Sequence, residues 1–521
     1  MEDYKPKTIP YEHQRRANLK SWLRQSFAYF MEMGTGKTKV AIDEMCALWD
    51  AGYIDAVVVI APKGSYMNWI NSEFPTHMPD CTVAESLIVP WRAGGGTKAH
   101  QVKLAELLKD YDRPLLPILV MNVEALSNGT HAYAFISQFV IKYKKIAIYV
   151  DESTSIRSPG ATRTKRVIEI GKRCLFRRIM SGFAAPNSPL DLFCQFEFLG
   201  TKLLGYGSYY AYRARYSILR TEYYRGRRVP VVVGYRDIED IQRRIEPHSF
   251  RVVKDECLDL PPKIYSFWDV EMTDEQRRIY DEIKENATAT LGAMSPCPKC
   301  KGGYQDFFDQ EGIKHEIVCN VCGGQGEIAG ANVTATAAIV QILRLQQVLC
   351  GHVTDEEGKI HDIPTNRPTD LLEILQEGSY KTIIWARFRR DLDKIGEHVK
   401  KEFGESSIVR YDGSVAQADR EIALERFQQG NARFFEGNPA VAGFGLTLTA
   451  ARSTVYYSNS YDLEQRMQSE DRPHRIGQKH PHNYVDMRCV GTVEEKIIKA
   501  LRAKINIGTV LMGDGYKEWL I

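Results

Sequence analysis

Glu32-Met33-Gly34-Thr35-Gly36-Lys37-Thr38 stands between the apolar run Phe27–Met31 and a stretch with apolar residues at helical spacing from Val40 onward. In a turn between a strand and a helix, glycines let backbone N–H groups close around phosphate oxygens, and the helix dipole adds attraction. This context predicts a phosphate-binding loop. The alternative, a glycine turn that only caps a helix, loses weight once the other motifs of the chain are counted.

Each residue type in this loop has an expected role. Lys37 should bridge the β- and γ-phosphates of a nucleotide, and Thr38 should coordinate Mg²⁺. The usual first glycine of the motif would fall at Met31, so the general pattern is incomplete. The predicted nucleotide-binding residues of the loop are Met33, Gly34, Thr35, Gly36, Lys37 and Thr38.

A second segment, Val150-Asp151-Glu152-Ser153, follows the apolar run Ile146–Val150. We expect Asp151 to hold the Mg²⁺ shell and Glu152 to polarise an attacking water. Alone, an Asp-Glu pair after a strand is more often a solvated strand end. In a chain that also has a phosphate loop, the catalytic interpretation of the pair becomes the favoured one.

The third segment is Gln468-Ser469-Glu470-Asp471-Arg472-Pro473-His474-Arg475. Arg472 and Arg475 are spaced to project from one helical face, where their charges would stabilise the transition state of phosphoryl transfer. Gln468 is expected to contact the nucleotide or to couple it to the cleft, and the alternative is an exposed charged helix. The three segments together predict an ATP site split between two lobes, with the catalytic residues Lys37, Asp151, Glu152, Arg472 and Arg475.

Two series of apolar strands that alternate with helical stretches predict two α/β lobes, each with a parallel sheet. The first series has candidate strands at Phe27–Met31, Ala56–Ala61, Pro117–Met121, Ile146–Val150 and Arg178–Ser181. The second has them at Thr382–Ala386, Ser407–Tyr411, Arg433–Glu436, Thr454–Ser458 and Asn483–Arg488. Helical candidates between the two series are Thr273–Leu291 and Ala331–Cys350. The predicted division is a first lobe over 1–200, a region of helices and a hairpin over 201–365, and a second lobe over 366–521.

Four cysteines interrupt the middle region as two C-x-x-C pairs, Cys297 with Cys300 and Cys319 with Cys322. Glycines follow both pairs and permit tight turns that aim N–H groups at thiolates. Four thiolates at this spacing predict a closed, structural Zn²⁺ site within an insertion at 295–326. Unligated thiols and a redox role are the weaker alternatives. The insertion would either contact DNA or a partner, or simply staple the fold.

Composition sets the class of protein. The chain has 521 residues, 44% of them hydrophobic and 26% charged, which predicts a globular protein of two to four domains. A net charge of +3 means that any nucleic-acid surface must be a local basic patch. The sequence shows no membrane-spanning run and no signal-peptide pattern, so we expect a cytoplasmic protein with reduced thiols.

The motifs resemble those of superfamily 2 helicases, and specifically of the Snf2 branch. Asp471-Arg472-Pro473-His474-Arg475-Ile476-Gly477-Gln478 is similar to the final motif of that branch almost residue for residue. Further similar segments are Tyr11–Gln14, Ala61–Lys63 with Trp69, Asp151–Ser158, Ser181–Asn187, Trp385–Phe388, Asp412–Ser414 and Gly443–Ala451. The resemblance implies two RecA-like lobes and a DNA-dependent ATPase in which Gln14 reads adenine. The compact chain suggests a bacterial or bacteriophage enzyme, located in the host cytoplasm if phage-encoded.

Two positions depart from the pattern of the branch. Thr154 stands where many relatives have histidine, and Phe183-Ala184 stand where Thr-Pro is expected. The latter motif is thought to couple nucleotide to DNA, so the departure bears on coupling and not on ATP binding.

The positions that match the DNA-contacting motifs imply a second set of residues. These are Lys63, Asn122, Arg157, Arg387 and Thr447. The stretch from Arg220 to Val233 adds a predicted hairpin with a basic tip, in which Arg225, Arg227 and Arg228 stand beside aromatic residues. The aromatic residues beside these arginines could stack on bases or wedge a junction, and the alternative is an exposed hairpin packed through its valines.

Our leading hypothesis is an ATP-dependent DNA helicase or translocase that moves along DNA and unwinds or remodels branched DNA such as forks and junctions, with ATP, Mg²⁺ and Zn²⁺ as ligands. A duplex translocase that displaces bound proteins without strand separation is one alternative. An ATP-switched DNA-binding scaffold is the other. We expect a monomer without membrane contact, with DNA and replication or recombination proteins as partners.

Overall fold

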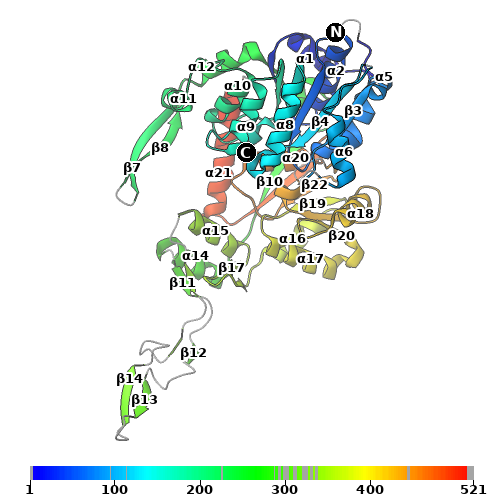
Figure 1. Cartoon of the computed structure of the whole chain (residues 1–521). Coiled ribbons are helices and arrows are strands. Elements are labelled where there is room, and N and C mark those ends of the chain that lie inside the picture. The colour runs from blue at the N-terminus through cyan, green and yellow to red at the C-terminus, as the bar shows by residue number, and fades with distance from the viewer. Residues whose placement is uncertain are drawn as a thin grey trace.

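The computed structural model describes residues 4–93, 96–112, 114–224, 227–286, 338–442 and 446–512, with short strand segments at 288–290, 295–296, 304–308, 314–318, 327–328 and 332–334. Figure 1 shows two lobes, the blue and cyan first part of the chain in the upper lobe and its yellow and orange later part in the lower one. The red helix α21 (Val493–Met512) runs from the lower lobe up beside the upper lobe, where it contacts α12 (Ile238–Ile245).

The first lobe is built on a seven-stranded sheet in which all neighbouring strands are parallel. Across the sheet the strands are β3 (Ser86–Pro90), β4 (Leu116–Asn122), β2 (Ala56–Ala61), β5 (Ile146–Val150), β6 (Phe176–Met180), β1 (Ser26–Met31) and β9 (Ser249–Val252). The five predicted strands are confirmed, with ends that shift by at most two residues. The two unpredicted strands, β3 and β9, are the edges of the sheet. β9 has only four residues and includes Ser249 and Arg251, so its apolar signal is weak.

The second lobe has a six-stranded sheet, also parallel throughout. Its strands, in order, are β10 (Lys263–Asp269), β23 (His482–Arg488), β22 (Ser453–Tyr456), β19 (Thr382–Trp385), β21 (Phe434–Gly437) and β20 (Ile408–Tyr411). Five of these strands were predicted. The edge strand β10 was not, because half-buried and exposed residues alternate along it and it lacks an apolar run. The predicted fold class, two α/β lobes on parallel sheets, is confirmed.

Helices cover both sheets. In the first lobe these are α1 (Glu12–Ser21), α2 (Lys37–Asp50), α3 (Tyr66–Asn68), α4 (Phe74–His77), α5 (Asp80–Ala84), α6 (Lys98–Glu106), α7 (Ala125–Asn128), α8 (Thr130–Lys142), α9 (Thr162–Gly171) and α10 (Leu192–Leu199). In the second lobe they are α16 (Arg367–Gln376), α17 (Arg389–Phe403), α18 (Gln417–Gln428), α19 (Pro439–Ala442) and α20 (Leu463–Glu470). All six residues of β2 are buried, as expected for a parallel sheet with helices on both faces.

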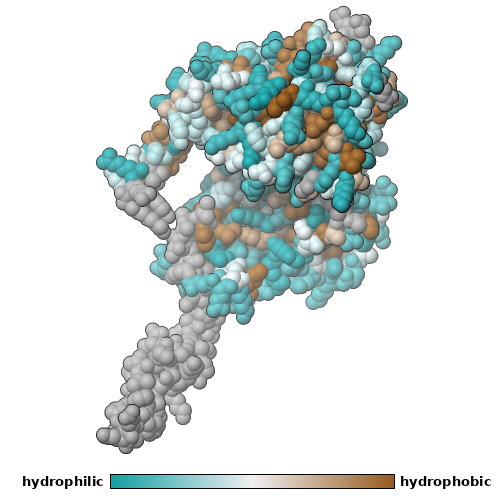
Figure 2. Space-filling model, in the orientation of Figure 1, coloured by the Kyte–Doolittle hydropathy of each residue, from teal (hydrophilic) through white to brown (hydrophobic). Residues whose placement is uncertain are grey.

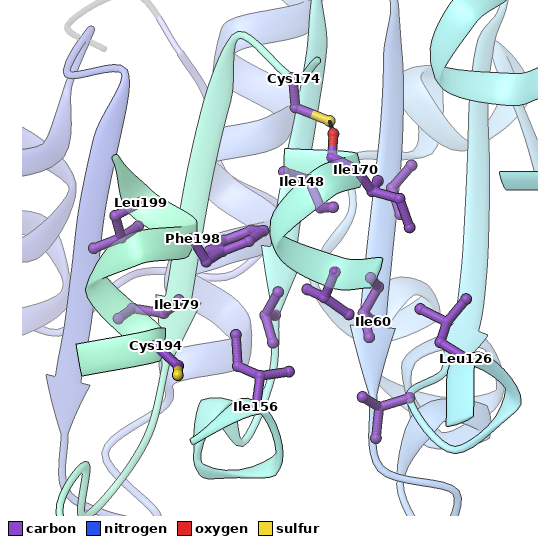
Figure 3. Close-up of a cluster of buried hydrophobic side chains, with 14 of the residues drawn as sticks. Ile60, Leu126, Ile148, Ile156, Ile170, Cys174, Ile179, Cys194, Phe198 and Leu199 are labelled. Carbon is purple, nitrogen blue, oxygen red and sulfur yellow. Dashed lines mark hydrogen bonds between the residues drawn. The ribbon is translucent and has the colours of Figure 1, made fainter. Parts of the chain in front are cut away.

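The core of the first lobe fixes the strands that carry functional residues at their carboxyl ends. Figure 3 shows Ile60, Ile148 and Ile179, which lie on β2, β5 and β6, gathered with Ile170 of α9 and Phe198 of α10. α9 approaches α10 closely at Gly171, where a Cβ would lie only 2.7 Å from Phe198 Cε2. Replacing a buried phenylalanine such as Phe198 by alanine typically costs about 3–5 kcal/mol of stability. The cluster therefore fixes the positions of β2, β5 and β6 and of the residues at their carboxyl ends.

The chain between the two series of strands contributes to both sheets, through β9 and β10. It also forms the hairpin of β7 (Ser217–Tyr224) and β8 (Arg227–Tyr235), preceded by α11 (Tyr209–Tyr216) and followed by α12. Further along are α13 (Lys254–Cys257), α14 (Asp274–Asn286), α15 (Ala338–Leu349) and the strand pair β17 (His352–Thr354) and β18 (Ile360–Asp362). In Figure 1 the β7–β8 hairpin projects away from the upper lobe.

Three antiparallel strand pairs extend from α14 and α15. They join β11 (Thr288–Thr290) to β16 (Asn332–Thr334), β12 (Ser295–Pro296) to β15 (Glu327–Ile328), and β13 (Tyr304–Phe308) to β14 (Lys314–Val318). The predicted zinc ligands Cys297, Cys300, Cys319 and Cys322 lie outside the described residues. Within the described ranges, no group of His, Cys, Asp or Glu side chains is arranged to hold a metal ion.

The surface of both lobes is mainly hydrophilic on the face seen in Figure 2. None of the helices in the described ranges is both long and apolar enough to cross a membrane.

Candidate nucleotide site between the lobes

The predicted phosphate loop lies at the carboxyl end of β1 and leads into α2. Gly34 and Gly36 have φ angles of +82° and +85°, in the left-handed region that favours glycine. Such a conformation turns successive N–H groups toward one concave side. α2 begins at Lys37, so the positive end of its dipole faces the same side. The buried Lys37 ammonium donates to the carbonyl oxygen of Met31 at 3.0 Å.

Gln14 of α1 is hydrogen-bonded to the backbone of this loop. Its Nε2 donates to the carbonyl oxygen of Thr35 at 3.0 Å, and His13 Nε2 lies 2.8 Å from the same oxygen. A Cβ on Gly36 would also meet Gln14 Nε2, which adds to the preference for glycine that the φ angle of +85° already gives. The structure therefore places Gln14 against the loop, and its role in reading adenine stays a prediction.

Asp151 and Glu152 follow β5 at the same edge of the sheet. Asp151 Oδ2 accepts a hydrogen bond from Trp69 Nε1 at 3.1 Å, and its Oδ1 accepts one from the Glu152 N–H at 3.0 Å. Glu152 has a φ angle of +44°, a strained conformation for a residue with a Cβ. Burial raises the pKa of Glu152 to about 7, and the Asp151 charge acts in the same direction while Lys37 opposes it.

The arginines of the third segment lie in a turn and not on a helical face as predicted. α20 ends at Glu470, because Pro473 lacks an N–H and disfavours helical conformation in the residue before it. Arg475 Nε donates to the carbonyl oxygen of Asp471 at 2.9 Å. Burial lowers the pKa of Arg472 to about 9, and the neighbouring Arg475 charge adds to this effect.

The five predicted catalytic residues nevertheless lie close enough together for their charges to act on one another. The charges of Asp151, Glu152 and Arg475 all act on the Lys37 ammonium, whose pKa is lowered by burial in spite of the two carboxylates. Arg475 comes from the second lobe, yet its Cγ lies 3.8 Å from the point that a Cβ on Gly34 would occupy. The cleft is therefore lined by residues from both lobes.

This set of side chains fits a nucleotide with Mg²⁺. The loop offers N–H groups and an ammonium to phosphates, and the hydroxyl of Thr38 and the carboxylate of Asp151 are oxygen ligands of the kind that Mg²⁺ prefers. Lys37 is the first residue of α2, so this lysine stands at the end of the helix where an anion would bind. Gln468 is buried on α20 and lies near Glu464, with its Nε2 3.5 Å from Glu464 Oε1.

Sequence reasoning missed Lys254 in this cleft. This residue follows β9, and its buried ammonium donates to Asp471 Oδ1 at 2.5 Å and to the carbonyl oxygen of His474 at 2.9 Å. In the sequence, the one indication of this residue was its place after β9, an edge strand that was itself not predicted.

Phe183, one of the two departures from the motif pattern, also joins the lobes. It follows β6 of the first lobe, but it packs in the hydrophobic cluster of the second lobe together with Ile279 and Leu463. An apolar contact therefore stands where relatives of the branch are expected to have a polar motif residue.

The residues predicted from motif positions to contact DNA have varied surroundings. Lys63 is exposed, and its N–H donates to Glu124 Oε2 at 3.0 Å. Asn122 Oδ1 accepts from the N–H of Ala125 at 2.9 Å and so caps α7. The exposed Thr447 accepts a hydrogen bond at its carbonyl oxygen from the Gln428 amide.

Two predicted DNA-contacting arginines are engaged within the protein. The Arg387 guanidinium donates to the Gln346 side chain, and burial lowers its pKa. Arg157 of the first lobe forms an ion pair with Glu464 of the second lobe at 2.7 Å. Thr154 donates to the other oxygen of Glu464 at 2.6 Å. Thr154, the second departure from the motif pattern, thus also contributes an interlobe contact.

The predicted hairpin is present as β7 and β8, with a register shift between Ile218 and Leu219. Arg225 lies outside the described residues, and Arg227 is described only as part of β8. Arg228 is exposed, and its Nε donates to the hydroxyl of the exposed Tyr223 at 3.1 Å. The pair presents a cation and an aromatic ring on the projecting hairpin.

Comparison with known proteins agrees with the motif pattern. The profile described as "SNF2-related domain" matches residues 27–320, and that described as "Helicase conserved C-terminal domain" matches residues 366–477. "TATA-binding protein-associated factor mot1" of Aspergillus fumigatus is 26% identical over 395 residues, which span 70% of this chain and 20% of that protein. "Protein CHROMATIN REMODELING 24" of Arabidopsis thaliana is 24% identical over 486 residues, 90% of this chain and 43% of that protein. The chain thus corresponds to less than half of these relatives.

Among solved structures, the "Sulfolobus solfataricus SWI2/SNF2 ATPase core in complex with dsDNA" aligns with a TM-score of 0.40 and 20% identity. The alignment covers 99% of this chain and 95% of the solved chain. The SNF2-related profile covers more than half of the 521 residues, and its limits include the phosphate loop and the Asp151-Glu152 pair. The chain belongs to the SNF2-related family.

Proposed function

We propose that this protein is a DNA-dependent ATPase that uses ATP hydrolysis to move along DNA. The observation that carries the proposal is that Lys37, Asp151 and Glu152 of the first lobe lie near Arg472 and Arg475 of the second, with Arg475 Cγ beside Gly34 of the phosphate loop. A site assembled from two lobes is complete only when the lobes are close together, so each catalytic cycle is coupled to a relative movement.

The side chains have separable tasks in this proposal. Lys37 and the N–H groups of residues 33–38 hold the phosphates, while Glu152 orients the attacking water. Thr38 and Asp151 would hold Mg²⁺, which would supply positive charge to offset the negative charge of the phosphates. Arg472 and Arg475 stabilise the charge of the transferred phosphoryl group, and Gln468 connects that group to the interlobe surface.

DNA is the proposed track. Lys63, Asn122 and Arg157 lie in the first lobe, while Arg387 and Thr447 lie in the second, so both lobes offer polar groups to a phosphate backbone. Contacts of this kind position a protein without reading bases. Movement of the lobes would then shift one set of contacts relative to the other.

We further propose branched DNA as the substrate and the β7–β8 hairpin as the element that engages the branch. Support comes from the projection of the hairpin (Figure 1) and from its exposed Arg228–Tyr223 pair. Cations beside aromatic rings suit single-stranded bases, which stack on such surfaces. Arg225 and Arg227, which stand near this pair in the sequence, are proposed to act with it.

The insertion between α14 and α15 is proposed to bind structural Zn²⁺ through Cys297, Cys300, Cys319 and Cys322. The support is the spacing of the cysteines together with the strand pairs that flank them in sequence, β12 with β15 and β13 with β14. Antiparallel strand pairs followed by C-x-x-C segments suit a tetrahedral thiolate site.

The test is ATP hydrolysis with and without DNA, followed by strand separation on a linear duplex, a fork and a four-way junction. Lys37→Ala is the control, and we expect it to reduce turnover by about 100-fold or more. DNA-stimulated turnover with separation of branched substrates supports the full proposal. Stimulated turnover without separation indicates a duplex translocase that displaces proteins. Negligible turnover with retained DNA binding would overturn the proposal in favour of a scaffold.

A further inference from the structure

Lys254 lies where the chain leaves the sheet of the first lobe. It is the first residue of α13, separated from the end of β9 by one residue, and the chain from there leads to β10 in the second sheet. Its exposed fraction is only 1%. A buried lysine at the passage between two lobes needs partners, because an isolated ammonium in the interior is costly.

The partners of Lys254 come from both sides of the nucleotide cleft. On the side of the first lobe, its N–H donates to Glu32 Oε2 at 2.8 Å, and its Cε lies 3.4 Å from the point that a Cβ on Gly34 would occupy. On the side of the second lobe, its ammonium donates to Asp471 Oδ1 at 2.5 Å and to the carbonyl oxygen of His474 at 2.9 Å. Lys254 therefore joins Glu32 through its backbone, lies beside Gly34 of the phosphate loop, and contacts the arginine-bearing segment through its ammonium.

Asp471 transmits this contact to the arginines. It precedes Arg472 in the chain, and its carbonyl oxygen accepts the hydrogen bond from Arg475 Nε. Burial opposes ionisation of Asp471, yet Lys254 and Lys263 hold its pKa below the ordinary value. Lys263 Nζ also lies 3.7 Å from Asp471 Oδ1. The carboxylate therefore has two lysines that keep it charged and in place.

We propose that Lys254 is a positioning residue that holds the arginine-bearing segment against the phosphate loop. The second lobe then adopts its catalytic position only when the phosphate loop has its catalytic conformation. This inference rests on the proposed ATPase function and deepens it. Lys254 acts through Asp471 on Arg472 and Arg475. Its loss should affect turnover more than nucleotide binding, since the loop and Lys37 remain.

A buried ion pair elsewhere in the first lobe provides a matched control. Lys39 pairs with Asp43 within α2 at 2.8 Å, and its exposed fraction is 5%. Its ammonium also donates to a carbonyl oxygen, that of Thr8, at 2.8 Å. Like Lys254, Lys39 contacts a carboxylate and a carbonyl oxygen, but Asp43 and Thr8 both belong to the first lobe. Lys39→Met therefore reports the cost of losing a buried lysine without losing the interlobe contact.

The experiment compares Lys254→Met, Asp471→Asn, the double variant and Lys39→Met in the full chain. Three measurements are made: steady-state ATP turnover with saturating duplex DNA, affinity for a fluorescent ATP analogue, and hydrogen exchange of residues 471–478 without nucleotide. We expect Lys254→Met to lower kcat at least tenfold, to change nucleotide affinity less than threefold and to speed exchange in 471–478. Asp471→Asn should do the same, and the double variant should be no worse than either single change.

The Lys39→Met control distinguishes a positioning role of Lys254 from a general loss of stability. Lys39→Met should keep kcat within twofold of the original protein and leave exchange in 471–478 unchanged, even if both lysine variants melt at lower temperature. Equal effects of Lys254→Met and Lys39→Met on kcat and exchange would overturn the inference. If the unaltered protein hydrolyses no ATP, the proposed function fails, and the exchange measurement still decides whether Lys254 fixes the segment.

Discussion

Glu464 of the second lobe occupies the space beside Arg157 of the first, with 2.7 Å between Glu464 Oε2 and Arg157 Nη1. Both side chains are partly buried, and Thr154 donates to the remaining oxygen of Glu464. A carboxylate that accepts from an arginine and a hydroxyl presents the same chemistry as a DNA phosphate. Arg157 can therefore contact a DNA phosphate only after its ion pair with Glu464 has broken.

This competition leads to the first prediction. Glu464→Gln removes the negative charge from the proposed DNA path, and we expect affinity for duplex DNA to rise about three- to fivefold, since an ion pair of this exposure is worth up to about 1 kcal/mol. Arg157→Gln should instead weaken binding and reduce its dependence on salt. Fluorescence anisotropy over a salt series measures both effects.

The control for that measurement is Glu425→Gln, which removes an equal charge from an exposed position on α18. Its affinity for DNA should match that of the unaltered protein. Unchanged affinity in Glu464→Gln, or an equal rise in both variants, would show that Glu464 does not compete with phosphate.

The second prediction concerns the projecting hairpin. Tyr223→Ala and Arg228→Ala remove the aromatic ring and the cation that lie together on β7 and β8. We expect either change to reduce separation of forked DNA severalfold while ATP turnover on duplex DNA stays within twofold, since stacking on a base is worth about 1–3 kcal/mol. Parallel assays of strand separation and phosphate release measure the two activities.

Arg243→Ala serves as the matched control for the hairpin, because Arg243 is also an exposed arginine of this region but lies on α12 and pairs with Asp240. It should leave both activities unchanged. Equal loss of separation and turnover in the hairpin variants would mean that the hairpin supports the ATPase and does not act on the branch.

The core strands and the three sequence segments could be predicted because each carries a strong local signal. β2 and β5 are continuous apolar runs, and Gly34 with Gly36 marks a conformation that only a glycine-rich turn adopts easily. The edge strands β9 and β10 carry no such signal, since their stability comes from pairing with distant strands.

The interlobe contacts escaped prediction for a related reason. Lys254 is one lysine among many in the sequence, and only the folded chain shows that it meets Asp471, more than 200 positions away. The pairing of Arg157 with Glu464 spans 307 positions. The helical placement of Arg472 and Arg475 was wrong because the spacing of the two arginines was weighed above the effect of Pro473.

The third prediction is that the protein as purified contains one zinc ion per chain. Elemental analysis measures the metal, and a chelator that removes it should lower the melting temperature, because binding to a folded site stabilises it. Replacing Cys297 and Cys300 together by serine should abolish zinc binding. Cys81→Ser, at an exposed cysteine in α5, should not change the metal content. A zinc-free protein with free thiols at all four positions would contradict the proposed site.

The last prediction concerns the dependence of stability on pH. Glu436 on β21 is buried with an exposed fraction of 3%, and burial raises its pKa to about 8, with Arg410 opposing and Asp412 reinforcing the shift. The folded chain therefore retains a proton that the unfolded chain releases. The stabilisation from this group is fully present below its unfolded pKa and is lost as the pH rises toward 8, by about 1.4 kcal/mol per pKa unit.

Glu436→Gln keeps the shape of the protonated side chain and removes this titration. Its melting temperature should exceed that of the unaltered protein at pH 8 and approach it at pH 5, as scanning fluorimetry can measure. Glu425→Gln, at an exposed residue, should follow the unaltered protein at both values of pH. Because Asp391 is also buried with its pKa raised to about 7, both proteins should lose some stability as the pH rises. The difference between the two melting curves therefore isolates Glu436, and a difference that does not change with pH would show that this carboxyl group is ionised in the folded protein throughout the range.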